Sequence, residues 1–143
     1  MDTSQVKLKA LVAEDDRAFA DIIRLALTRA GFEVSVAFDG QKAQQLAHSV
    51  QFNVVVSDYQ MPIVNGENLL ASIRATSLSR EALLILCSAK SYELNSERLR
   101  DELGLSAIFY KPFSLSELVA VATNARRLVV ASKTEVPVSS VSC

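Results

Sequence analysis

The amino-acid sequence predicts an α/β fold in which a parallel sheet carries helices on both faces. Short runs rich in Val, Ile and Leu, of strand length and bounded by polar residues, alternate with stretches whose apolar residues recur at helical spacing. Five such strand-helix units follow one another, an order typical of a doubly wound parallel sheet. The 143 residues, 50% of them hydrophobic, suffice for one domain with its own core but not for two of ordinary size.

The first unit joins an apolar run at residues 6–13 to a helix that follows Asp16. Apolar residues between Phe19 and Ala30 keep the three-and-four spacing of an amphipathic helix. Asp16 is suited to cap the start of this helix and Gly31 to cap its end, so both boundaries are predicted.

The second and third units repeat this order. A strand is expected at 33–38, where polar and apolar residues alternate, and a helix at 41–50 after a turn dipeptide. The third strand, at 53–57, leads into a loop that ends at Gly66, where the next helix opens.

The fourth and fifth strands are expected at 82–87 and 107–110. Between them the sequence predicts a helix over 92–103. Gly104 follows this helix directly and is expected to stop it.

Ser114 and Glu117 have the spacing of a capping box at the start of the last helix, which is expected to end near Ala131. Residues 132–143 contain a proline and four serines, and we expect them to form a flexible tail. The predicted domain therefore covers residues 5–131.

Charge and composition argue against nucleic-acid binding and membrane insertion. Lys and Arg number 15 against 16 Asp and Glu, which leaves no basic excess for a phosphate backbone. No apolar stretch reaches the ~18 residues that a membrane span requires, and the N-terminus lacks a basic region followed by an apolar one. We therefore expect a cytoplasmic protein.

The cysteines and the single histidine are expected to have ordinary roles. Cys87 lies in an apolar strand and Cys143 ends the chain, so they form neither a disulfide framework nor a metal site. We expect Cys87 to be a buried structural thiol. His48 falls on the polar side of a predicted helix and is expected at the surface, which leaves the chain without a histidine phosphodonor of its own.

Polar residues follow four of the predicted strands at their C-terminal ends. They are Glu14, Asp15, Asp58, Ser88 and Lys111. The carboxyl ends of parallel strands meet at one edge of an open sheet, and ligands bind at that edge. We therefore expect three carboxylates, one hydroxyl and one ammonium to converge there.

Three carboxylates brought this close repel one another, so protons or a cation must compensate their charge. All-oxygen ligands with room for water favour Mg²⁺ over zinc or copper. Each residue also has an ordinary role when taken alone: a solvated loop acid or helix cap, a turn residue, or a lysine that reaches solvent. Their combination favours a site that handles phosphate oxygens.

Four stretches carry a family resemblance: LVAEDD at 11–16, VVVSDYQMPIVNG at 54–66, the Ser88-Ala89 pair, and FYKPF at 109–113. In this order and over about residues 7–131, the chain resembles the CheY-like receiver domain of bacterial two-component response regulators. The resemblance implies a flavodoxin-like (βα)5 fold with strand order 2-1-3-4-5.

The resemblance also implies that Asp58 is phosphorylated, with a phosphoryl group from the phosphohistidine of a histidine kinase, a phosphotransfer protein or a small acyl phosphate. A carboxylate can attack phosphorus when a magnesium ion and a cation neutralise the transferring oxygens. By similarity, Lys111 and Ser88 would contact phosphoryl oxygens. The implied metal ligands are Asp15, Asp58, the backbone carbonyl of Gln60, and Glu14 through bound water.

Such a domain takes up and releases its own phosphoryl group without turning over a separate substrate. By resemblance, a downstream protein would read the face formed by residues 92–131, and the sequence leaves pairing with a second copy open. Ile108 stands where many receivers have an aromatic residue that swings inward. Phe109 is expected on the opposite face and Tyr110 nearer the site, so signalling is expected to rely on the loop after Ser88 and the following helix.

Three other functions fit the sequence less well. A haloacid-dehalogenase-type phosphatase needs a second acid two residues after the nucleophile, where Gln60 cannot act as a general acid. A flavodoxin-like FMN binder needs a phosphate-binding first loop, which the acids at 14–16 oppose. A receiver-like scaffold that binds partners without phosphorylation has no need of the full acidic and basic set.

Overall fold

The computed structural model describes residues 7–89 and 94–141, with the backbone alone for 130–141. Its five strands pair in parallel in the order β2-β1-β3-β4-β5, which confirms the predicted fold class and strand order. The strands are β1 (Lys9–Ala13), β2 (Glu33–Ala37), β3 (Val54–Asp58), β4 (Leu83–Ala89) and β5 (Leu105–Lys111). The helices are α1 (Arg17–Arg29), α2 (Gly40–Ser49), α3 (Gly66–Thr76), α4 (Ser96–Leu103) and α5 (Leu115–Val141).

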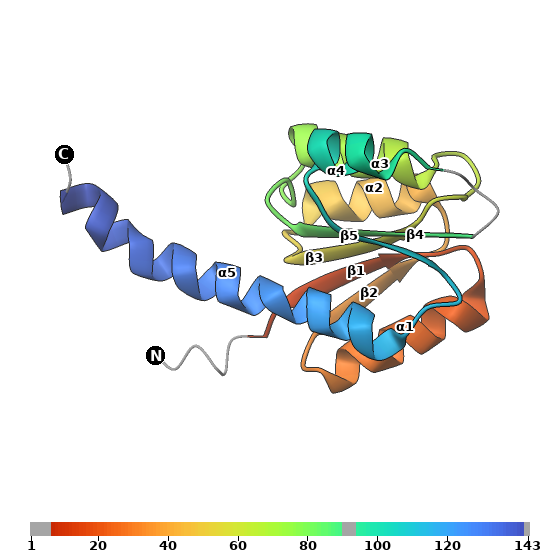
Figure 1. Cartoon of the computed structure of the whole chain (residues 1–143), viewed down its shortest axis with the longest axis horizontal. Helices are drawn as coiled ribbons and strands as arrows, with labels where there is room; N and C mark the ends of the chain where they lie inside the picture. Colours follow the sequence, from red (N-terminus) through yellow and green to blue (C-terminus); the bar gives the residue numbers. More distant parts are fainter. Residues whose placement is uncertain (1–6, 90–93, 142–143) are drawn as a thin grey trace.

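Helices cover both faces of the sheet. Figure 1 shows α1 and α5 on one face, and α2, α3 and α4 on the other. Consecutive residues of β3 serve both cores: Val55 packs on the α2–α4 side, whereas Val54 and Val56 pack on the α1–α5 side. Burial on both faces explains why the strand sequences are continuous apolar runs.

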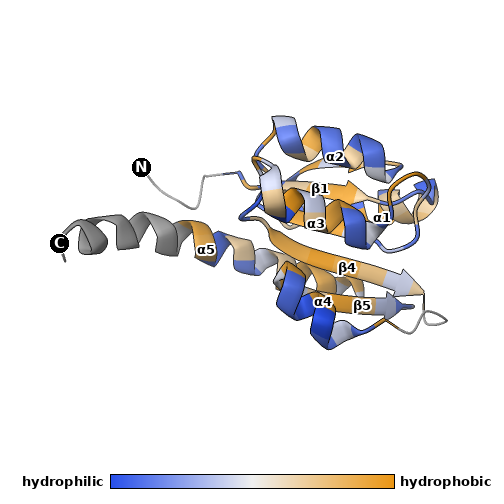
Figure 2. Ribbon diagram, turned by 90° about the horizontal axis from the view of Figure 1, so that it is seen from above, coloured by the Kyte–Doolittle hydropathy of each residue, from blue (hydrophilic) through white to orange (hydrophobic). Residues whose placement is uncertain are grey.

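Hydropathy follows the same layers. Figure 2 shows apolar residues concentrated in β1 and β4, while α2 and α4 carry many hydrophilic residues. Among the described residues, no helix combines the length and the apolar character needed to cross a membrane.

Side-chain caps fix where several helices begin. Asp16 accepts a hydrogen bond from the Phe19 amide at 3.1 Å, which confirms the predicted cap of α1. At the end of α1, Gly31 has a φ of 100°, a left-handed conformation that suits glycine. Ser114 Oγ accepts from the Glu117 amide at 3.3 Å, as the capping box requires at the start of α5.

The ends of two helices differ from the sequence prediction. The helix expected from residue 92 is described from Ser96, because the Asn95 side chain caps it there; residues 92 and 93 lie outside the described residues. The expected end of α5 near Ala131 is wrong for the backbone, which stays helical to Val141. No glycine or proline lies between Ala131 and Val136, so nothing in that stretch forces the helix to stop.

Candidate functional site

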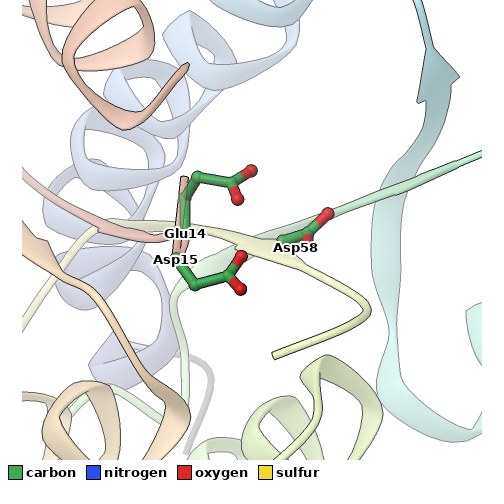
Figure 3. Close-up of side chains that lie close together, drawn as sticks. All are labelled: Glu14, Asp15 and Asp58. Carbon is green, nitrogen blue, oxygen red and sulfur yellow. The ribbon is translucent and has the colours of Figure 1, made fainter. Parts of the chain in front are cut away.

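The carboxyl ends of β1 and β3 bring three acidic side chains together. Carboxylate oxygens of Glu14, Asp15 and Asp58 lie within 4.8 Å of one another. Figure 3 shows these carboxylates extending to the same side of their strands. With Lys111 from the end of β5, they line an open cleft of about 520 Å³. Its other lining residues are Asp16, Gln60, Met61, Pro62 and Ala89.

Asp58 is placed by a buried strand and by a glycine behind it. All five residues of β3 are buried, and the Tyr59 amide donates to the Cys87 carbonyl at 2.7 Å. The Gly66 amide donates to the Tyr59 carbonyl at 2.7 Å, so α3 begins directly against the end of β3. A Cβ atom at Gly66 would overlap the Asp58 carbonyl oxygen, and this close approach requires glycine.

Lys111 is held against two of the acids. Its Nζ atom lies 3.2 Å from Glu14 Oε1 and 3.2 Å from Asp58 Oδ1. The following peptide bond, to Pro112, is cis. Nζ also lies 4.6 Å from the centroid of the Phe19 ring. The ammonium therefore has defined neighbours on several sides.

Glu14 is almost inaccessible, with 2% of its surface exposed. Its Oε2 atom accepts a hydrogen bond from the Asp16 amide at 3.1 Å. The pKa of Glu14 is raised to about 7, chiefly by burial. The hydrogen bond from Asp16 lowers this pKa, the charge of Asp58 raises it, and Lys111 lowers it. Burial therefore outweighs the pairing of Glu14 with Lys111.

Asp58 is affected in the same way. Burial raises the pKa of Asp58, and the charge of Asp15 adds to this, while Lys111 opposes both. Burial lowers the pKa of Lys111, but the charges of Glu14 and Asp58 outweigh it and the pKa is raised. One ammonium thus offsets only part of the negative charge of three carboxyl groups.

Of the other two predicted site residues, Gln60 lines the cleft and Ser88 is not among its lining residues. Ser88 is buried near the end of β4, and its hydroxyl donates to the Ala89 carbonyl at 3.3 Å. The proton of the Ser88 hydroxyl is thus directed to this carbonyl and not to the acidic cluster. Gln60 is exposed and lines the cleft.

The sequence did not identify Phe19 as a neighbour of the site. Its predicted place on the apolar face of α1 is confirmed, because it packs against the core on the α1–α5 side, but its ring also lies against Lys111. A signal was present, because Phe19 lies in the first turn of a helix that starts at the acidic loop.

The residues around β5 lie as strand alternation predicts. Ile108 is 9% exposed and belongs to the core on the α2–α4 side, against which Tyr110 also packs. Phe109 packs against the core on the α1–α5 side.

The predictions for Cys87 and His48 are also confirmed. Cys87 is buried, and burial followed by the charge of Asp58 raises its thiol pKa, so it is a structural thiol. His48 is exposed on α2, and its Nδ1 atom lies 2.9 Å from the Gln44 carbonyl oxygen.

Curated relatives share the sequence pattern. The chain is 30% identical over 117 residues to the "probable transcriptional regulator ycf29" of Pyropia yezoensis, which covers 81% of this chain and 52% of the relative. The protein of the same name from Porphyra purpurea is 30% identical over 115 residues, covering 80% of this chain and 54% of the relative. The chain spans about half the length of the curated relatives it matches.

Solved structures share the fold. The receiver domain of the Francisella response regulator 1452 is 29% identical, with a TM-score of 0.76, and covers 86% of this chain and 99% of its own. The receiver domain of the Pseudomonas aeruginosa sensor histidine kinase PA1611, solved with a magnesium ion in its active-site cleft, is 21% identical. Its TM-score is 0.73, and the match covers 85% of this chain and 98% of that one. Residues 10–123 match the response regulator receiver domain family, and this chain therefore belongs to it.

Proposed function

We propose that this chain is a phosphoacceptor receiver in which Asp58 accepts a phosphoryl group. The donor is the phosphohistidine of a histidine kinase or phosphotransfer protein, or a small acyl phosphate. The observation that carries the proposal is the pair of 3.2 Å contacts that fix Lys111 Nζ beside Asp58 and Glu14. A carboxylate that lines a cleft, with an ammonium beside it, meets the needs of attack on phosphorus.

In the transfer, an Asp58 carboxylate oxygen attacks phosphorus while the bond from phosphorus to the donor's imidazole nitrogen breaks. The imidazole leaves with that electron pair and takes up a proton, and an acyl phosphate remains on Asp58. The Lys111 ammonium meets the charge on the transferred oxygens. Ser88 turns its hydroxyl from the Ala89 carbonyl to donate to one of them.

The residues present fit a magnesium ion. Two carboxyl groups with raised pKa values and one exposed carboxylate form an all-oxygen set that a divalent cation relieves. When bound, the ion neutralises charge on the phosphoryl oxygens. The receiver of PA1611, to which the chain is similar, holds magnesium in its cleft. The proposed ligands are Asp15, Asp58, the backbone carbonyl of Gln60, and Glu14 through a water molecule.

The phosphorylated state is read on the face formed by residues 92–131, which includes α4, β5 and the start of α5. A dianion at Asp58 draws Ser88 inward, and the loop after Ser88 leads directly to α4.

The chain belongs to a signalling family, and we propose that it turns over no separate substrate. We also propose that it acts in the cytoplasm and that its receiver unit covers residues 5–131.

Intact mass tests the proposal. Incubation with magnesium and acetyl phosphate should add one phosphoryl group to the wild type and none to Asp58→Asn. Asp21→Asn is the matched control, because Asp21 is an exposed acid on α1 that pairs with Arg24 away from the cleft. If magnesium binds but the mass of the wild type does not increase, the chain would instead be a scaffold that binds partners without phosphorylation. Repeated release of phosphate from phosphomonoesters would indicate a phosphatase.

A further inference from the structure

We infer that Phe19 is a positioning residue for phosphoryl transfer to Asp58, because its ring supports the Lys111 ammonium. The inference rests on the phosphoacceptor role proposed above. Lys111 Nζ lies 4.6 Å from the Phe19 ring centroid, within the range of cation–π contacts. The ring comes from α1 and the lysine from β5, so the contact joins two elements that meet at the site.

The Phe19 ring is itself held in place. Its centroid lies 5.7 Å from that of Phe113 in a T-shaped arrangement, and the Phe113 centroid lies 5.3 Å from that of Phe109. Phe113 follows Lys111 by two residues, so the ring packs on the segment that carries the lysine. The Phe19 amide donates to the Asp16 side chain at 3.1 Å, which fixes the first turn of α1.

The chemistry of the ammonium explains what the ring contributes. A lysine ammonium has three donors on a flexible stem, and nothing in the side chain itself fixes its direction. Lys111 directs its charge to Glu14 and Asp58, each at 3.2 Å. The electron-rich face of Phe19 stabilises the cation without offering an oxygen acceptor, and its apolar body displaces water. The ring therefore keeps the ammonium aimed at Asp58 and does not compete with an incoming phosphoryl oxygen.

Two variants of Phe19 distinguish the effect of its aromatic face from the effect of its side-chain volume. Phe19→Leu should lower the second-order rate constant for phosphorylation by acetyl phosphate about five-fold, the loss expected for one partly desolvated cation–π contact. Phe19→Tyr keeps the aromatic face and should restore the rate to within about two-fold of the wild type. Phe38→Leu is the matched control: it removes a ring that lies 4.1 Å from the Arg17 guanidinium and outside the cleft.

Two further readouts distinguish positioning from packing. In a Lys111→Met background, Phe19→Leu should cause no additional fall in rate, because the contact that it removes is already absent. In NMR spectra, the ring current should shift the Lys111 ε-methylene protons upfield in the wild type and in Phe19→Tyr. In Phe19→Leu this shift should be lost.

Equal phosphorylation rates for the wild type and a folded Phe19→Leu would overturn the inference. An equal fall in the Lys111→Met background would overturn it too, since Phe19 would then act through packing alone. If the wild type gains no phosphoryl group, the proposed function fails, and the upfield shift still shows whether the ring supports Lys111. Thermal unfolding of each variant establishes that it is folded.

Discussion

Individual residues at the strand ends set the charge balance of the site. Sequence reasoning predicted that Glu14, Asp58 and Lys111 meet, because parallel strands deliver their C-terminal ends to one edge. It could not predict that Glu14 is 2% exposed while its neighbour Asp15 is exposed, since their burial depends on the path of the chain from β1 to α1. For the same reason it could not predict which ring lies against Lys111.

Glu14→Gln should make the stability of the metal-free protein less dependent on pH. The folded-state pKa of Glu14 is about 7 against an ordinary value of 4.5, so the folded state binds the extra proton between these values. The wild type therefore loses stability as pH rises from about 4.5 to about 7, and a permanently neutral side chain does not. At pH 8 the variant should be more stable by about 1–3 kcal/mol, because one pKa unit corresponds to about 1.4 kcal/mol and the lost Lys111 pair offsets part of the gain.

Urea unfolding at pH 5 and pH 8, without divalent cations, measures this difference. Glu33→Gln is the control, because Glu33 is exposed on β2 and lies outside the cleft. Equal pH dependence in Glu14→Gln and the wild type would show that Glu14 does not hold the extra proton.

Among the helices and strands, the sequence predicted most reliably the boundaries that depend on local interactions. Asp16 and the Ser114–Glu117 pair fixed helix starts because side-chain caps are local interactions. The end of α5 was predicted wrongly: Ser and Thr only weakly disfavour a helix, and the helical backbone also passes Pro137 and continues to Val141, which sequence propensity does not explain.

The loop between β3 and α3 contains a strained residue. Ile63 has a φ of 74° and is 73% exposed, and the Val64 amide donates to the Pro62 carbonyl at 2.8 Å across it, so a β-branched side chain occupies the centre of a strained γ-turn without burying itself. Ile63→Asn should raise the free energy of unfolding by about 1 kcal/mol, because asparagine occurs at positive φ more readily than a β-branched residue. Ile22→Asn, at a half-exposed position within α1, should instead lower it. Urea unfolding measures both, and a loss of stability in Ile63→Asn would contradict the strain.

Arg74 joins α3 to the end of α4. Its Nε donates to the Leu103 carbonyl at 2.8 Å and its Nη2 to the Gly104 carbonyl at 3.1 Å; Nη1 donates to the Arg80 and Ala82 carbonyls. Arg74→Met should lower the free energy of unfolding by about 3 kcal/mol, since several carbonyls lose a charged donor. It should also speed amide hydrogen exchange near the C-terminus of α4.

The control for Arg74 is Arg100→Met, at an exposed position on the outer surface of α4. It should change stability by less than about 0.5 kcal/mol. Similar losses in the two variants would show that Arg74 contributes no more than an ordinary surface residue.

For the whole molecule, the fold could be predicted from the sequence pattern because the same strand-helix unit is repeated five times. A continuous apolar strand requires cover on both faces, and each intervening helix supplies it. The same topology places Asp58 between β1 and β4, with the other acids on one side and Ser88 on the other. What the pattern does not determine is which hydrogen bond a side chain makes there, as Ser88 shows.

Magnesium should stabilise the whole domain through this site. At a free concentration of 100 times Kd, it should raise the free energy of unfolding by about 2.7 kcal/mol. Asp15→Asn should lose most of this gain, because it removes an exposed carboxylate of the cluster. Thermal unfolding in magnesium chloride, compared with sodium chloride of equal ionic strength, measures this stabilisation in the wild type and the variant. The same rise in both salts would show screening of charge instead of a bound ion.

Locating the modified residue shows whether Asp58 itself carries the phosphoryl group. After incubation with magnesium and acetyl phosphate, borohydride reduces an aspartyl phosphate to the corresponding alcohol, which peptide mass spectrometry locates. We expect the alcohol at position 58 alone, and none without acetyl phosphate. Reduction at Asp15 or Glu14, or at no position, would contradict this expectation.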